Sequence, residues 1–98
     1  MKFVVTEKQT PNGILLVVTD ADILGKKYEE GKKQLDLENK FYHGHEKSQA
    51  EVLDLFQQAY ILHLTGIGAV GLALKEGLIG KKNIIVVKGI PHVEILLG

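Results

Sequence analysis

Histidines and carboxylates are the residues of this 98-residue sequence that could carry acid–base or metal chemistry, since it has four His and twelve acidic residues but no Cys. His43 and His45 stand two apart and Glu46 follows, which places two imidazoles and a carboxylate close together in the sequence. A zinc site needs three or four ligands that converge tetrahedrally, and alternate residues of a loop often diverge. We therefore treat a metal role for this loop as a minority hypothesis and predict no cofactor.

An enzyme built on this sequence would centre on His92, with a carboxylate such as Asp20 or Asp22 as the partner of its imidazole. Both acids have simpler interpretations. Asp20 can N-cap a short helical turn over residues 21–24, and Asp22 lies at the favourable end of that turn's dipole. A small enzyme or metal-binding protein centred on His92 therefore stays an alternative, and we favour a non-enzymatic role.

Residues 66–71, Gly-Ile-Gly-Ala-Val-Gly, match the dinucleotide-binding fingerprint G-x-G-x-x-G. That motif holds a pyrophosphate when a strand leads into the helix that it opens. Upstream, however, a capping box at Ser48 and apolar residues at helical spacing predict one helix that ends at Gly66. We therefore interpret the glycines as a tight corner between two helices, and we expect His63 to be a hydrogen-bonded core or boundary residue of the first helix.

Twelve lysines balance the twelve acids, and the sequence has no arginine. Zero net charge excludes a protein that finds nucleic acid through overall positive charge, and we predict no DNA partner. Lysine pairs at 26–27, 32–33 and 81–82, together with Phe41 and Tyr42, still leave room for a local RNA surface. Without guanidinium groups such a surface has only lysine point charges, so its binding would depend strongly on salt.

The elements that would position these residues follow from the apolar pattern and from turn signals at 10–13 and 89–92. In chain order they predict strands over 3–5, 14–18 and 33–38, a loop over 41–45, a helix from Ser48 to Gly66, a helix over 67–76 that turns Ile67, Val70, Ala73 and Leu74 inward, and strands over 84–88 and 93–97. This order indicates a single α+β domain over residues 1–98, with a largely antiparallel or mixed sheet and a two-helix pair packed on it.

Residues 55–74 carry no charge and are long enough to span a membrane. Gln57, Gln58 and His63 interrupt this segment, and two amides and an imidazole would be costly in hydrocarbon. The N-terminus reaches a charge before an apolar stretch could form a signal peptide. We therefore expect a cytoplasmic protein with no membrane partner.

Three short segments carry a resemblance to a known family: Thr-Asp-Ala-Asp-Ile-Leu-Gly-Lys at 19–26, Phe-Tyr-His-Gly at 41–44 and Gly-Ile-Pro-His at 89–92. With Leu-Thr-Gly at 64–66 between them, the chain resembles the archaeal family called domain of unknown function 424 over essentially its whole length. The resemblance implies an RNA-binding or translation-associated role. Members of that family often carry Asn where this chain has His63, and Ala-Gln where it has Val93-Glu94.

The partner that we expect first is therefore RNA or the ribosome, bound without catalysis. The resemblance singles out Asp20, Lys26, Tyr42 and His92 as a ligand or RNA surface, with Lys26 and His92 on a common exposed face near other lysines. The alternative partner is a protein, or a second copy in a homo-oligomeric module, which would use apolar surface from the last strand over 93–97.

Overall fold

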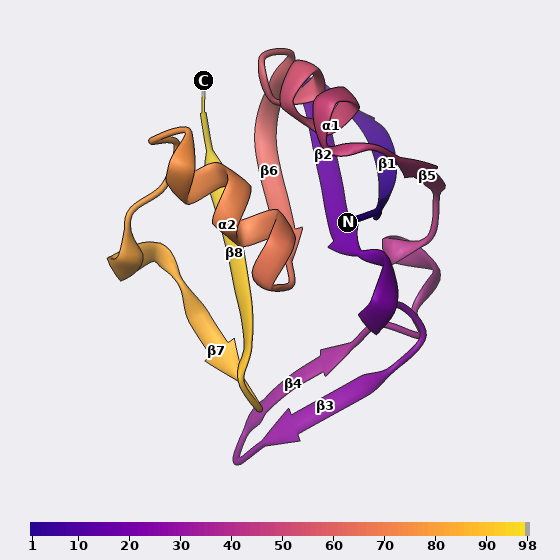
Figure 1. Cartoon of the computed structure of the whole chain (residues 1–98), viewed down its shortest axis with the longest axis vertical. Coiled ribbons are helices and arrows are strands. Elements are labelled where there is room, and N and C mark those ends of the chain that lie inside the picture. The colour runs from indigo at the N-terminus through magenta and orange to yellow at the C-terminus, as the bar shows by residue number, and fades with distance from the viewer. Residues whose placement is uncertain (98) are drawn as a thin grey trace.

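A six-stranded mixed sheet forms the centre of the structure, a computed structural model that describes residues 1–97 (Figure 1). Its strands lie in the order β5-β1-β2-β6-β8-β7, and every neighbouring pair is antiparallel except the parallel pair β2 and β6. A separate hairpin, β3–β4, extends from one end of the molecule. This α+β architecture confirms the predicted fold class. The strands are β1 (Phe3–Thr10), β2 (Gly13–Asp20), β3 (Lys27–Glu30), β4 (Lys33–Asp36), β5 (His45–Lys47), β6 (Ala59–Thr65), β7 (Ile85–Val87) and β8 (Ile90–Leu96).

Two helices, α1 (Gln49–Phe56) and α2 (Ile67–Lys75), cover one face of the sheet, which we call the front face (Figure 1). α1 begins at the predicted capping box. The Glu51 N–H donates to Ser48 Oγ at 3.3 Å, and the Ser48 N–H donates to Glu51 Oε1 at 2.9 Å. Each side chain thus satisfies a backbone donor that the first helical turn leaves free.

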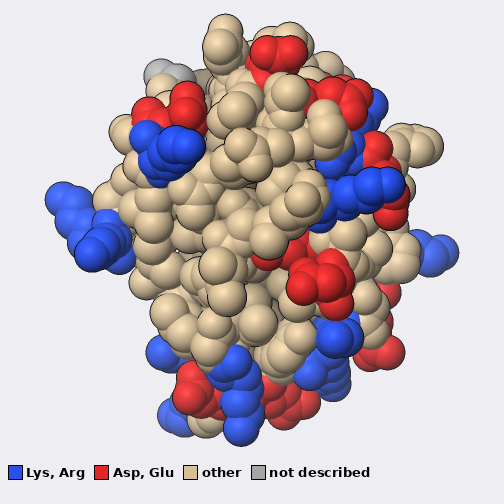
Figure 2. Space-filling view, viewed as in Figure 1, with Lys and Arg blue, Asp and Glu red and all other residues tan. Residues whose placement is uncertain are grey.

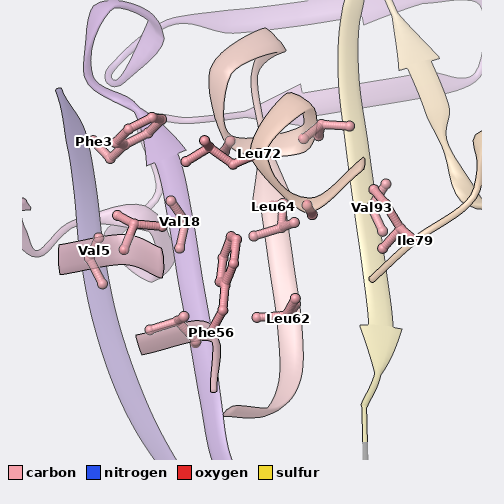
Figure 3. Close-up of a cluster of buried hydrophobic side chains, with 14 residues drawn as sticks. Phe3, Val5, Val18, Phe56, Leu62, Leu64, Leu72, Ile79 and Val93 are labelled. Atoms are coloured by element: carbon pink, nitrogen blue, oxygen red, sulfur yellow. The ribbon is translucent and has the colours of Figure 1, made fainter. Parts of the chain in front are cut away.

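The main apolar core lies between these helices and the front face of the sheet. Figure 3 shows the ring of Phe56 beside Val18 of β2 and Leu62 of β6. Because successive side chains of a strand point to opposite faces, the front face takes alternate residues of each strand. The buried members of this core are Phe3, Val5, Leu16, Val18, Val52, Phe56, Leu62, Leu64, Ala69, Val70, Leu72, Ala73, Ile79 and Val93.

The opposite face, which we call the back face, is covered in part by β3, β4 and the segment that follows them. The short 3-10 helix η2 (Lys40–Tyr42) packs against β1 and β2, and both β3 and β4 contact β7. Leu35 and Leu37 of this cover are buried. The hairpin is tied to the sheet where the Lys88 N–H donates to Glu30 Oε1 at 3.2 Å. The sheet is therefore covered by helices at the front and only in part by irregular chain at the back, where Glu94 and Leu96 of β8 are exposed.

The predicted first helix is wrong in its second half. α1 ends at Phe56, and residues Ala59–Thr65 form β6, the strand between β2 and β8. Alternation of apolar and polar residues in β6 is confined to residues 62–65, and Tyr60 and Ile61 before them do not continue it, so the strand signal is short. Apolar residues at helical spacing on both sides of Gln57 and Gln58 therefore gave the pattern of one longer helix.

The turn predicted at 89–92 is also displaced. Lys88 and Gly89 form the two-residue loop of the β7–β8 hairpin, with positive φ angles of 52° and 80° that are typical of a type I′ turn. Ile90, Pro91 and His92 are then the first residues of β8. Pro91 is accommodated because it lies near the start of β8, beyond the last β6–β8 pair, where a backbone N–H is dispensable; its carbonyl accepts the Gly66 N–H at 2.9 Å. His92 therefore has a fixed strand orientation rather than a loop position.

α2 has nearly the predicted extent, but Ile67 does not point inward. As the first residue of the helix it is 69% exposed, whereas Val70 and Ala73 are buried as expected. The short polar strands β3 and β5 had no apolar alternation to predict them. No helix among residues 1–97 is long and apolar enough to cross a membrane.

Candidate functional site

The glycine motif lies in a strand–turn–helix, contrary to the prediction, because β6 leads through Gly66 into α2. The carboxylate of Asp20, at the end of β2, occupies the start of that helix. The Gly68 N–H donates to Asp20 Oδ2 at 2.8 Å, and the Ala69 N–H donates to Asp20 Oδ1 at 2.8 Å. The prediction that Asp20 caps its own short turn is wrong, since that turn receives no side-chain hydrogen bond from it.

A bound phosphate would need the position that the Asp20 carboxylate fills, because the first N–H groups of a helix form the anion site of such motifs. Gly66 has a φ of 112°, and a Cβ there would collide with the Asp20 side chain. At Gly68 a Cβ would approach Asp20 Oδ1 to 2.9 Å. Burial raises the pKa of Asp20 above its usual value, and the two backbone donors oppose that rise. Gly66 and Gly68 therefore admit an internal carboxylate at the position that a nucleotide phosphate would need.

A second polar centre lies on the back face, where four rings meet: Phe41 and Tyr42 from η2, His63 from β6 and His92 from β8. We call it the histidine cluster. The centroid of the His63 ring is 4.7 Å from that of Phe41, 5.8 Å from that of Tyr42 and 4.6 Å from that of His92, and all three contacts are edge-to-face.

The register of β6 and β8 sets the hydrogen bonds of this cluster. Thr65 is opposite His92, and His63 is opposite Glu94. His92 Nδ1 lies 2.8 Å from Thr65 Oγ1, and His63 Nδ1 lies 2.9 Å from Glu94 Oε2. An ionised carboxylate only accepts, so Nδ1 of His63 carries the proton and its Nε2 presents a lone pair. That Nε2 is buried and has no hydrogen-bond partner within residues 1–97.

Both imidazoles of the cluster favour the neutral form. Burial lowers the pKa of His63, and hydrogen bonding to Glu94 opposes this only in part. Burial, with repulsion from His63, lowers the pKa of His92 from its usual value of 6.5 to about 4. Burial and the carboxylates of Asp36 and Glu94 raise the pKa of Tyr42, so its hydroxyl keeps its proton at neutral pH. The cluster is thus neutral, with acidic groups at its edge.

Beside the cluster lies an open hollow of about 480 Å³, which we call the aromatic hollow. It is lined by Gln34, Asp36, Asn39, Phe41, Tyr42 and His63. The Nζ of Lys8, which extends from β1, is 4.9 Å from the centroid of the Phe41 ring. Because the rings of Phe41 and Tyr42 are inclined at 83° to each other, a flat ring could stack on one of them, while polar groups of the lining meet its edge.

Two of the four residues singled out by the sequence, Tyr42 and His92, lie together around His63. Asp20 is instead buried at the start of α2. Lys26 is exposed just before β3, where its backbone bonds to Ile23 and Leu37. His92 is half-buried on the back face.

Sequence reasoning missed His63 and Glu94 as site residues. His63 was assigned to a helix, although its interpretation as a buried hydrogen-bonded residue is confirmed. The available signal was the departure from the family pattern at positions 63 and 94. These two positions are opposite one another in the sheet, and their side chains form a hydrogen bond.

The helix side of the molecule has no dominant charge. Figure 2 shows lysine and acidic side chains interspersed around a wide uncharged area over the face that carries α1 and α2. No group of three or more His, Asp or Glu residues within the described chain is arranged to hold a metal ion.

Comparison with known proteins gave a family and a fold. The model of the family described as "Protein of unknown function (DUF424)" matches residues 7–97. Among solved structures, the chain is similar to an uncharacterized conserved protein from Methanopyrus kandleri, with a TM-score of 0.78 and 19% sequence identity over 99% of this chain and 92% of that one. At that identity the likeness supports the fold alone. The comparison with curated proteins found no match.

Proposed function

The chain belongs to the family of unknown function DUF424, as its motifs predicted. From its geometry, we propose that it binds single-stranded RNA by stacking an unpaired base in the aromatic hollow. The observation that carries this proposal is the half-buried pair Phe41 and Tyr42 beside a polar-lined hollow. Proteins that bind unpaired RNA commonly stack bases on aromatic side chains and read the base edges with polar groups.

The charges around the hollow favour an orientation with the base inside and the backbone outside. Asp36 and His63 line the hollow, and Glu94 bonds to the His63 imidazole. The two carboxylates would repel a phosphate from the hollow. Lys8, which approaches the ring of Phe41, and the exposed Lys40 of η2 can meet phosphates at the rim. Since the chain has no arginine, these contacts are point charges and the affinity should fall with salt.

Fluorescence anisotropy with a labelled single-stranded RNA of about 12 nucleotides, a length within the usual site size of such proteins, tests the proposal. Tyr42→Ala should raise Kd roughly 5- to 150-fold, the loss of one base–aromatic stack. Tyr42→Phe keeps the ring and should bind as the native protein does. Tyr28→Ala, which removes a half-buried tyrosine from β3 outside the hollow, is the matched control.

The proposal fails if low-salt buffer gives no binding, or if Tyr42→Ala binds as tightly as Tyr28→Ala while both remain folded by circular dichroism. Preference for the single strand over a duplex of the same sequence is also required, because a paired base cannot enter the hollow.

The cytoplasmic ribosome, or another translation complex, is the partner that we propose as the source of such unpaired RNA. Pull-down from native lysate, with and without RNase, tests this part separately. RNase-sensitive recovery of ribosomal RNA is expected. Recovery of a protein that RNase does not affect would favour a protein partner instead.

Self-association is the second candidate, and exposed apolar groups at the edge of the sheet favour it. Ile85 and Val86 of the edge strand β7 are 53% and 44% exposed, and Leu96 of β8 is 63% exposed. Edge strands with free backbone groups and apolar side chains readily pair with another chain. Sedimentation velocity should then detect dimers that Ile85→Lys removes, and a monomer at every concentration would exclude this function.

A further inference from the structure

We infer that the aromatic hollow selects guanine among the unpaired bases of RNA. This inference rests on the proposed function and adds the identity of the base. It follows from the hydrogen-bonding groups that remain available in the lining once the internal bonds of the protein are made.

The carboxylate of Asp36 is the first of these groups. Its Oδ1 accepts the Glu38 N–H at 3.2 Å, and Oδ2 has no hydrogen bond within residues 1–97. Each carboxylate oxygen has two lone-pair sites, so the group can still accept a pair of parallel N–H donors. A base edge with two adjacent donors is therefore the best complement to Asp36.

Asn39 supplies the opposite property. Its Oδ1 accepts the Phe41 N–H at 2.9 Å, which fixes the orientation of the side-chain amide. The Nδ2 group is then left as a donor beside the hollow, where it can meet a carbonyl oxygen of a bound base.

His63 also lines the hollow, but its free acceptor nitrogen is buried beneath the surface. Its imidazole is only 9% exposed, and the Glu94 bond leaves Nε2 as an unpartnered lone pair. The polar groups that a ligand in the hollow can reach are therefore those of Asp36 and Asn39.

Among the four bases, guanine alone presents a carbonyl acceptor, O6, next to two adjacent donors, N1–H and N2–H₂, on its Watson–Crick edge. Adenine presents one amino group beside a ring nitrogen acceptor, cytosine presents one amino group beside a ring nitrogen and a carbonyl, and uracil places one N–H between two carbonyls. The carboxylate of Asp36, which accepts two donors, and the amide of Asn39, which donates, therefore complement the edge of guanine better than those of the other three bases.

Short RNAs that differ in one base test the inference on the native protein. The probes are UUGUU, UUAUU, UUCUU, UUUUU and the inosine form UUIUU, which lacks only the N2 amino group of guanine. Binding is followed by shifts of backbone amide resonances. UUGUU should bind roughly tenfold or more tightly than UUIUU, since a hydrogen bond to a charged group is lost.

Asp36→Asn keeps the oxygen that accepts the Glu38 N–H but removes the carboxylate, and it should reduce UUGUU binding to the level of UUAUU. Glu38→Gln is the matched control, because it removes a neighbouring exposed charge without changing the hollow. Equal binding of all five RNAs would overturn the selection of guanine and leave RNA binding intact. Binding of none would overturn both proposals, and the inosine comparison decides the inference even if Asp36→Asn fails to fold.

Discussion

The two faces of the central sheet differ in how completely their buried groups are satisfied. On the front face, apolar side chains of α1 and α2 meet apolar strand residues, and the buried acid Asp20 has both carboxylate oxygens bonded. The back face carries buried polar residues. Within residues 1–97, the buried side-chain atoms without a partner are Thr19 Oγ1 and His63 Nε2, and both lie there.

This difference bears on which face mainly stabilises the fold and on which face we propose binding. An unsatisfied buried polar atom costs about 1–3 kcal/mol, which a sequence shaped for stability alone would avoid. Departures from consistent packing are expected at functional sites. The front face is thus the stabilising half of the molecule, and the back face, with its aromatic hollow, is where we place binding.

The largest expected effect comes from a cavity in the front-face core. Leu64 is fully buried there, so Leu64→Ala should lower the free energy of unfolding by about 2–5 kcal/mol. Urea unfolding followed by circular dichroism measures this. Leu96→Ala is the control, since that side chain is 63% exposed and its loss should cost less than about 0.5 kcal/mol. Equal effects of the two variants would contradict the assignment of the core.

Acidification should destabilise the protein through the back face. The pKa of His92 is about 4 in the folded protein but 6.5 in an unfolded chain, and burial lowers that of His63 as well. The unfolded chain therefore binds more protons between these values. The contribution of His92 to the free energy of unfolding is fully present above about pH 6.5 and is lost as the pH falls toward about 4. Because His92 is only half-buried, we expect acidification to lower the free energy of unfolding by an amount on the order of 2 kcal/mol.

Urea unfolding at a series of pH values tests this loss. The groups that face His92 are Thr65 and His63, with Glu94 nearby. His92→Gln should flatten the fall in stability, whereas His45→Gln, which alters an exposed residue of the edge strand β5, should leave it unchanged. A pH profile that neither variant changes would assign the acid sensitivity to other groups.

Removing the Asp20 carboxylate should have a smaller effect, because only the start of α2 loses its partner. Asp20→Ala leaves the N–H groups of Gly68 and Ala69 without an acceptor and should cost about 1–2 kcal/mol. Asp20→Asn keeps one acceptor oxygen and should cost less. Asp22→Ala, at an exposed neighbour, is the control. Thermal unfolding that gives the same Tm for Asp20→Ala and Asp22→Ala would show that this bond does not stabilise the fold.

The elements that the sequence predicted correctly are those governed by local signals. The Thr-Pro-Asn-Gly turn and the capping box at Ser48 depend on residues within a few positions of each other, and both form as expected. β6 was missed because its alternation covers only residues 62–65, too short a run to outweigh the helical spacing that begins at the capping box. The wrong helix prediction also affected the site, because a helical His63 would not be opposite Glu94 in a sheet.

Asp20 shows the same limit at the level of a single side chain. A local cap on residues 21–24 was a sufficient explanation of its type and position, yet its partners, Gly68 and Ala69, are 48 and 49 residues away. The family motifs identified Tyr42 and His92. Their contact with His63 could not be predicted, because it depends on the register of β6 and β8.

The smallest expected effect separates binding from stability on the back face itself. Lys8 contacts the ring of Phe41 from outside, an interaction worth about 0.5–1 kcal/mol at an exposed site, so Lys8→Gln should change stability by no more than that. Its effect on RNA should instead appear in the salt dependence, where one lost phosphate contact lowers the slope of log Kd against log salt by about 0.7. Lys75→Gln, at the end of α2 on the front face, should leave the slope unchanged. If both variants lower the slope equally, the RNA follows the general charge of the protein, and the aromatic hollow is not where it binds.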